Sequence, residues 1–321
     1  MTKWLVSAAA VIAVLVGAWF WQFGPSAQHG DQRPLRLGIN PWPGYEFLYL
    51  AEVNGYFKEE GLNITLKQFS ALEDVRNAFE NHSIDGMCTT LVELLQAKAN
   101  SGKQGRVTLV ADFSNGADDI VASQSINSVQ QLKGKKVGVE AKSLGVMMLA
   151  RALQLNGMKP EDVDVLYLDQ LSMAAAFKAG TIDAAVSYPP KSIEMAKTGR
   201  RIFDSSQIPG EIVDIVSFDE AALSSHPGLQ AALQRVWTKS LNFAKQNPVK
   251  AHAIMAKREG ITPAEFADAL TGLKLIDAAA QAAYFAPGGA LERTIGFTIQ
   301  TLQQSKDLMG DVGTAAQYIQ R

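Results

Sequence analysis

The sequence has few of the residues that build disulfides and metal sites. Among 321 residues there is one cysteine, Cys88, which excludes an intramolecular disulfide, and there are four histidines without ligand spacing. The formal net charge is only −2, from 30 Lys and Arg against 32 Asp and Glu. This balance gives no reason to expect a polyanionic partner. We therefore predict no metal, no cofactor and no nucleic-acid ligand.

Three catalytic or nucleotide-binding signatures are also missing. The chain contains no Gly-x-Ser-x-Gly, no Gly-x-x-x-x-Gly-Lys and no glycine-rich dinucleotide fingerprint after its first expected strand. The histidines fall in expected loops or on expected helix surfaces, away from strand ends: His29, His82, His226 and His252. We therefore predict that the protein is not an enzyme.

The first 27 residues differ in character from the rest of the chain. After Lys3, an uncharged run extends from Trp4 to Trp21, with aromatic residues at both ends as in interfacial belts. At a rise of about 1.5 Å per residue this run just spans a hydrocarbon core of roughly 30 Å, and it exceeds the usual secretory apolar region of about 7–15 residues. No good cleavage site and no lipid-bearing cysteine follow. We predict an uncleaved transmembrane signal anchor over 1–27, with the bulk of the chain outside the inner membrane; the alternative is a cleaved signal peptide.

An internal repeat of about one hundred residues organises the remaining chain. Three segments of the first half recur in the same order in the second half. The matched pairs are "PLRLGIN" with "GKKVGVE", "AEVNGYFKEEGLNITLKQF" with "ARALQLNGMKPEDVDVLYL", and "VRNAFENHSIDGMCTT" with "MAAAFKAGTIDAAVSYPP". Each half has the pattern β-α-β-α-β, with a glycine suited to a left-handed helix cap after its first helix. This pattern predicts α/β domains with parallel sheets and helices on their faces.

Two connections are expected between the halves. Ser114-Asn115-Gly116 interrupts two apolar runs and predicts a bend, and "GEIVDIVSFDEAAL" forms a second connection before a helical tail. Two such units, joined by two chain connections, predict a clamshell: two domains with a hinge and with a cleft between them. The predicted division is a discontinuous domain I, 34–117 and 217–321, and a domain II, 118–216.

Several segments together resemble a known family of transport proteins. The segments are "LRLGINPWPGYEFLYLAEVNGYFKEEGLNITLKQF", "SIDGMCTT", "SNGADDIVAS", "LKGKKVGVE" and "AGTIDAAVSYPP". In this order they are similar to the nitrate/sulfonate/taurine class of solute-binding proteins that serve ABC importers, over about 33–321. The resemblance implies a type II periplasmic-binding-protein fold, a small solute, and the ABC permease and ATPase subunits as partners. Most relatives are released into the periplasm or carried on a lipid, so a retained protein anchor is a departure.

The candidate ligand-binding residues follow from a rule of open α/β sheets. Ligands bind beyond the carboxyl ends of the strands, where helix N-termini offer free N–H groups and partial positive charge. The loop "NPWPGY" occupies this position in the first half, with a tryptophan held between two prolines. We predict that the following residues converge on one cleft and bind the ligand: Trp42, Gly44, Tyr45, Thr89, Thr90, Asp118, Asp119, Ser143, Leu144, Gly145 and Tyr188.

Most candidates also have a purely structural interpretation. Gly44 would then belong to a turn, and Trp42 and Tyr188 would be packing aromatics. Thr89, Thr90 and Ser143 would be helix caps, and the two aspartates would be solvated or capping groups. Asp85 and Asp183, in matching positions of the repeat, are expected to hold turns. Cys88 is expected to be a small buried strand residue.

The predicted function is extracytoplasmic capture of a small solute and its delivery to an ABC importer. A zwitterion such as taurine would suit helix N-termini together with Asp118 or Asp119, while a small nitrogen compound remains an alternative. A second function is a membrane-tethered sensor that acts on a partner protein. A third is a pyrimidine-precursor synthase, but the clustered cysteines of that family are missing here.

Overall fold

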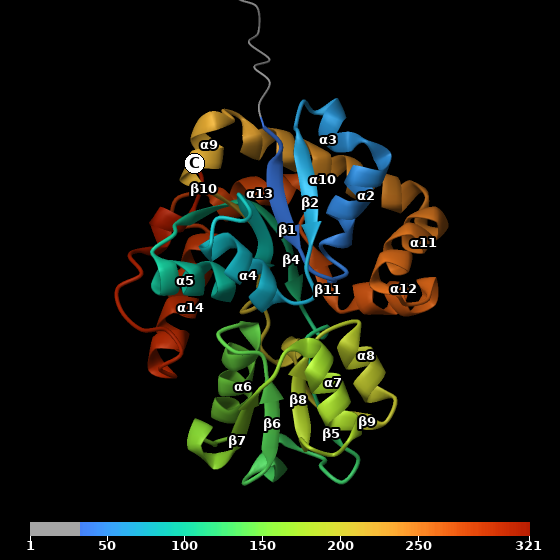
Figure 1. The fold of residues 1–321 in the computed structure, drawn as a ribbon, viewed down its shortest axis with the longest axis vertical. Coiled ribbons are helices and arrows are strands. Elements are labelled where there is room, and N and C mark those ends of the chain that lie inside the picture. The colour runs from blue at the N-terminus through green and yellow to red at the C-terminus, as the bar shows by residue number, and fades with distance from the viewer. Residues whose placement is uncertain (1–32) are drawn as a thin grey trace, which may run out of the picture. The chain divides into compact units, whose positions relative to one another are not determined.

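The computed structural model describes residues 33–321, and the strands of Leu35–Arg321 form two sheets (Figure 1). The six-stranded sheet has the order β11 (Leu273–Leu275), β4 (Gly105–Ser114), β10 (Val213–Asp219), β3 (Gly86–Thr90), β1 (Leu35–Ile39), β2 (Ile64–Gln68). The five-stranded sheet has the order β7 (Asp164–Tyr167), β6 (Lys136–Val139), β8 (Ala184–Ser187), β5 (Asp119–Ser123), β9 (Gly199–Asp204). We call the sheets with their helices lobe I and lobe II.

Helices cover the faces of both sheets (Figure 1). Lobe I contains α2 (Glu46–Asn54), α3 (Tyr56–Glu59), α4 (Leu72–Glu80), α5 (Leu91–Ser101), α9 (Glu220–Ser225), α10 (Leu229–Gln246), α11 (Pro248–Glu259), α12 (Pro263–Thr271), α13 (Ala278–Phe285) and α14 (Ala290–Gln304). Lobe II contains α6 (Leu144–Leu155), α7 (Gln170–Lys178) and α8 (Lys191–Ala196). Short 3₁₀ turns are η1 (Val129–Leu132), η2 (Pro160–Asp162), η3 (Ser205–Gln207) and η4 (Ala315–Tyr318).

The predicted repeat is confirmed in both lobes. Strand β1 pairs in parallel with β2 and β3, and β6 pairs in parallel with β7 and β8. Gly55 ends α2 with φ 77°, a left-handed conformation that favours glycine. Asp85 and Asp183 accept hydrogen bonds from the backbone N–H of Arg36 and Lys136. Each aspartate therefore ties the start of the third strand of its half to the first strand, as expected of structural turn residues.

The helical tail also follows its sequence signals. Pro248 and Pro263 each open a helix at its first position, where the missing N–H costs nothing. Thr262 caps α12 in a reciprocal capping box with Glu265. The last long helix, α14, runs from Ala290 to Gln304.

The chain crosses between the lobes twice, and the two crossings touch. Ser114 at the end of β4 lies 2.7 Å, Oγ to Oγ, from Ser205 in η3, and the same Ser205 hydroxyl accepts from Gly116 N–H at 2.6 Å. The division predicted at 216/217 falls inside β10, a strand of lobe I. We propose that the second boundary lies just before Val213, while the first stays between β4 and β5.

The predicted membrane anchor over 1–27 lies outside the described residues. Within 33–321, no helix combines the length and apolar character needed to cross a bilayer. The anchor and its place in the inner membrane therefore stay predictions.

Candidate ligand-binding site

A small cavity lies where lobe I and lobe II meet. Its walls come from the loop after β1, from the starts of α4, α5 and α6, from the end of β8, and from the starts of β5 and β10. The lining residues are Asn40, Trp42, Tyr45, Leu72, Thr90, Asp118, Leu144, Tyr188 and Asp214. Six of the eleven predicted residues line it. The cavity volume is about 10 Å³, no more than one water molecule requires, so the two lobes are closed directly on each other.

Trp42 connects the lobes through its indole ring. Its side chain is only 3% exposed, and its Nε1–H points to Asp112 Oδ2 at 3.4 Å. Its ring meets the ring of Tyr188 from lobe II edge to face, with centroids 6.1 Å apart and an interplanar angle of 82°. The flanking Pro41 and Pro43 restrict the backbone of the loop, so this ring is held in place before any solute arrives.

Two carboxyl groups of adjacent strands lie beside the aromatic residues Trp42 and Tyr45. Asp112 of β4 and Asp214 of β10 stand opposite each other in the antiparallel register, and Tyr45 Oη donates to Asp214 Oδ1 at 2.6 Å. Asp112 Oδ1 and Asp214 Oδ2 have no hydrogen-bond partner among the described residues. Burial raises the pKa of Asp112 to about 8 and raises that of Asp214 well above its usual range.

The adjacent aspartates predicted for the cleft separate in the structure. Asp118 lines the cavity, and its Oδ2 is buried without a hydrogen-bond partner in the described part of the chain. Burial raises the pKa of Asp118 to about 7. Asp119 instead forms an ion pair with Arg201, Oδ2 to Nε 2.6 Å, and does not line the cavity. Asp119 is the first residue of β5, while Asp118 still belongs to the bend before that strand, so the two side chains have different surroundings.

A carboxyl group of each lobe caps a helix of the other lobe. Glu93 of α5 accepts from Ser143 Oγ at 2.6 Å and from Leu144 N–H at 2.8 Å, at the start of α6. Glu140, directly after β6, accepts from Glu73 N–H at 2.8 Å, in the first turn of α4. Burial raises the pKa of Glu140 to about 7. These two contacts join the lobes through the helix N-termini that would otherwise be free to bind an anion.

Four further predicted residues lie close to the cavity without lining it. A Cβ at Gly44 would stand 1.9 Å from Asp112 Oδ2, so this glycine is required by the close approach of that carboxyl. Gly145 similarly packs against Val139, at 3.0 Å from a hypothetical Cβ. Ser143 occupies the N-cap position of α6, but its hydroxyl donates to Glu93. Thr89 is fully buried in β3, and its hydroxyl has no partner among the described residues.

Several residues of the site were not singled out in the sequence. They are Asn40, Leu72, Glu93, Asp112, Glu140 and Asp214. A signal existed for some of them. Asp112 and Asp214 interrupt otherwise apolar strand segments, where an ionisable residue needs a reason. Asn40 and Glu140 occupy the same position of the repeat, directly after its first strand.

Comparison with known proteins gives this site a family context. A family model described as NMT1/THI5 like matches residues 42–251. The chain belongs to this NMT1/THI5-like family. The matched segment contains Trp42, Asp118, Tyr188 and Asp214 of the cavity, and it confirms the resemblance found in the sequence.

Individual relatives carry different names within this family. A Brucella abortus protein named as a binding protein is 32% identical over 171 residues, 52% of this chain and 52% of its own length. A 4-amino-5-hydroxymethyl-2-methylpyrimidine phosphate synthase of Saccharomyces cerevisiae is 27% identical over 184 residues, 56% of this chain and 54% of its own. The chain thus spans about half the length of either relative.

A solved structure of a solute-binding protein shares the fold. The alkanesulfonate-binding protein SsuA from Xanthomonas axonopodis pv. citri, bound to MOPS, superposes with a TM-score of 0.76. The match covers 90% of this chain and 99% of that one at 17% identity. This likeness establishes the periplasmic-binding-protein fold for the two-lobed part of the chain.

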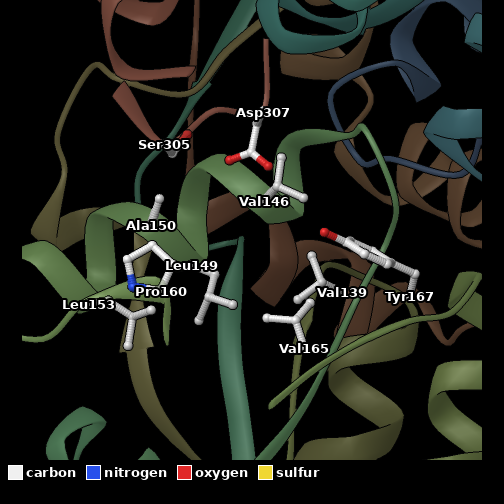
Figure 2. Close-up of a pocket in the computed structure, with 10 residues that line it drawn as sticks. All are labelled: Val139, Val146, Leu149, Ala150, Leu153, Pro160, Val165, Tyr167, Ser305 and Asp307. Carbon is white, nitrogen blue, oxygen red and sulfur yellow. The ribbon is translucent and has the colours of Figure 1, made fainter. Parts of the chain in front are cut away.

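A larger cavity, of about 170 Å³, lies away from this site (Figure 2). Figure 2 shows aliphatic side chains of β6, β7 and α6 pointing toward one another, with Ser305 and Asp307 after α14 at its edge. It lies between the sheet of lobe II, helix α6 and the segment after α14 of lobe I. The smaller cavity is the better candidate because it combines three aromatic rings with buried carboxyl groups that have oxygen atoms unpaired within the described part of the chain.

The buried carboxyl groups make lobe closure sensitive to pH. In the closed state burial raises the pKa of Asp118 and Glu140 to about 7 and of Asp112 to about 8, and Asp214 shifts the same way. Opening admits water and returns these values toward about 4, so the closed state binds more protons between these limits. Closure should therefore weaken as the pH rises, by up to about 1.4 kcal/mol per pH unit for each group.

X-ray scattering at constant ionic strength should test this dependence. The solute-free protein should have a larger radius of gyration at about pH 8 than at about pH 5. Asp118→Asn should reduce the difference, because one of the groups no longer titrates. The same radius of gyration at both pH values would contradict the expectation.

Proposed function

We propose that the protein captures a small solute between its lobes outside the cytoplasm and delivers it to an ABC importer. The observation that carries this proposal is the cavity itself, whose walls come from both lobes at the carboxyl ends of their parallel strands. A solute held there contacts both lobes at once and therefore stabilises their closed arrangement. An inner-membrane anchor over 1–27 would keep the protein beside its permease.

The cavity residues have properties that suit capture better than chemistry. Cys88 is fully buried, and burial raises the pKa of its thiol, which leaves it a poor nucleophile. None of the three described histidines lines the cavity. Because a yeast relative is named as a synthase, the absence of enzymatic activity stays part of the proposal.

Solute-induced compaction tests the proposal, and Trp42 provides the decisive variant. At about pH 8, where the solute-free lobes are expected apart, a bound solute should reduce the radius of gyration of the detergent-solubilised full chain. Trp42→Ala removes a ring that contacts both the cavity and Tyr188. It should weaken solute binding by roughly 1–3 kcal/mol, the order of one large apolar contact.

Trp237 supplies the matched control for this experiment. It is fully buried in α10, donates from Nε1 to Ile276 O, and lies outside the cavity. Trp237→Ala should lower the free energy of unfolding by about 3–5 kcal/mol and leave the affinity of the folded protein unchanged. Unchanged affinity in Trp42→Ala would show that its ring is a packing residue, and compaction by no solute would contradict capture between the lobes.

A further inference from the structure

The polar atoms left free in the cavity are all hydrogen-bond acceptors. Asp118 Oδ2, Asp214 Oδ2 and Asn40 Oδ1 are buried in the cavity lining and have no donor among the described residues. The nine lining residues include no lysine, arginine or histidine. An unsatisfied buried acceptor costs free energy until a donor reaches it. When its carboxyl groups are ionised the cavity therefore lacks donors, and a solute that carries N–H groups would supply them.

Both interlobe helix N-termini are already occupied by the chain. Glu93 accepts from the first N–H of α6, and Glu140 accepts from the first turn of α4. A sulfonate or nitrate would need these N–H groups and would have to displace a carboxyl group of the protein. It would also lie beside the carboxyl groups of Asp118 and Asp214 in the cavity lining, and their ionised forms would repel it.

The aromatic residues of the cavity favour a positive charge as well. Trp42, Tyr45 and Tyr188 all line it, and aromatic faces attract organic cations. Tyr45 already donates its hydroxyl proton to Asp214, and Trp42 directs its N–H to Asp112. Their polar hydrogens are thus used within the protein, and their ring faces are what remains for a solute.

We propose that the solute is a small organic cation that carries N–H donors, such as a protonated amine, amidine or guanidine, with its charge beside Asp118 and the Asp112–Asp214 pair. This inference rests on the proposed capture of a solute between the lobes and narrows it to one class. The adjoining carboxyl groups neutralise the cation, and the free acceptors take its N–H groups.

Calorimetric titration of the full-length protein in mild detergent, at about pH 8, tests the inference. Methylguanidinium and nitrate form one pair of probes, since both have a planar trigonal centre and their charges are opposite. Ethylammonium and taurine form the second pair, since taurine adds only a sulfonate. We expect saturable binding of methylguanidinium or ethylammonium, none of nitrate, and weaker binding of taurine than of ethylammonium.

Two variants locate the charge. Asp118→Asn should weaken binding of the cation about 10- to 100-fold, the range of a charge-assisted hydrogen bond. The matched control is Asp219→Asn, at the far end of β10, where the carboxyl caps α9 and pairs with Lys103. It should leave the affinity unchanged. Because Asp118→Asn replaces a buried carboxyl group, whose Oδ2 has no partner among the described residues, with a neutral amide of similar size, it is expected to fold.

Each outcome separates this inference from the proposed function. Binding and compaction with nitrate or taurine, but with neither cation, would overturn the cationic solute and leave solute capture intact. Cation binding that Asp118→Asn does not weaken would overturn the assigned position of the charge. Binding of no probe of either charge would overturn the cationic solute and count against capture itself.

Discussion

Replacing Glu93 with alanine should leave the two lobes predominantly apart in the absence of solute. Glu93 is fully buried and accepts from Ser143 Oγ and Leu144 N–H across the interface. It also accepts from the backbone and hydroxyl of Thr90, which completes the capping box of α5. The variant loses both interlobe hydrogen bonds, and each loss leaves a buried donor without an acceptor. The free energy of lobe closure should therefore become less favourable by about 2–4 kcal/mol.

If the open and closed states are similarly populated, a change of that size leaves almost all molecules in the open state. Scattering at about pH 5, where the wild-type protein is expected to be closed, should show a larger radius of gyration for Glu93→Ala. Glu52→Ala is the control, since Glu52 accepts from Leu66 N–H inside lobe I and makes no interlobe bond. A closed Glu93→Ala protein with normal thermal stability would show that other contacts hold the lobes together.

Replacing Arg258 with methionine should have the largest effect on stability. Its side chain is 5% exposed and forms an ion pair with Glu46, which is fully buried at the start of α2. The neighbouring Glu259 is buried too, and neither of its carboxyl oxygens has a partner among the described residues. Without Arg258, Glu46 loses its ion-pair partner, and Glu259 loses a nearby cation that lowers its pKa. Breaking a buried ion pair typically costs about 3–5 kcal/mol.

Urea denaturation at two pH values checks this expectation and its cause. Burial raises the pKa of Glu46 to about 8 although Arg258 lowers it, and removing Arg258 would raise it further. The folded variant then binds more protons than the unfolded chain, so its stability should fall as the pH rises from about 5 to about 8. Glu46→Gln added to Arg258→Met should recover part of the loss. Equal stability of Arg258→Met and wild-type protein at about pH 8 would contradict this account.

The sequence alone determined the architecture, because its signals are local and occur twice. The glycine cap after the first helix, the Ile-Asp turn before the third strand and the alternation of apolar residues act within a few residues. Their repetition in order predicted two parallel β-α-β-α-β units, which the pairings of β1 and β6 confirm. The same local reasoning predicted a shared cleft for six residues near strand ends and helix starts that line one cavity in the structure: Trp42, Tyr45, Thr90, Asp118, Leu144 and Tyr188.

Only the tertiary structure decided how charge is distributed in the cavity. Asp112 and Asp214 come together because β4 and β10 pair as antiparallel strands after the chain has passed through lobe II and returned. Glu93 and Glu140 reach helix starts in the opposite lobe only when the lobes close. Such contacts depend on elements far apart in the chain, so no local pattern encodes them. These contacts change the expected charge of the solute. The sequence predicted that the helix N-termini would be free to bind an anion, but carboxyl groups of the protein already accept their N–H groups.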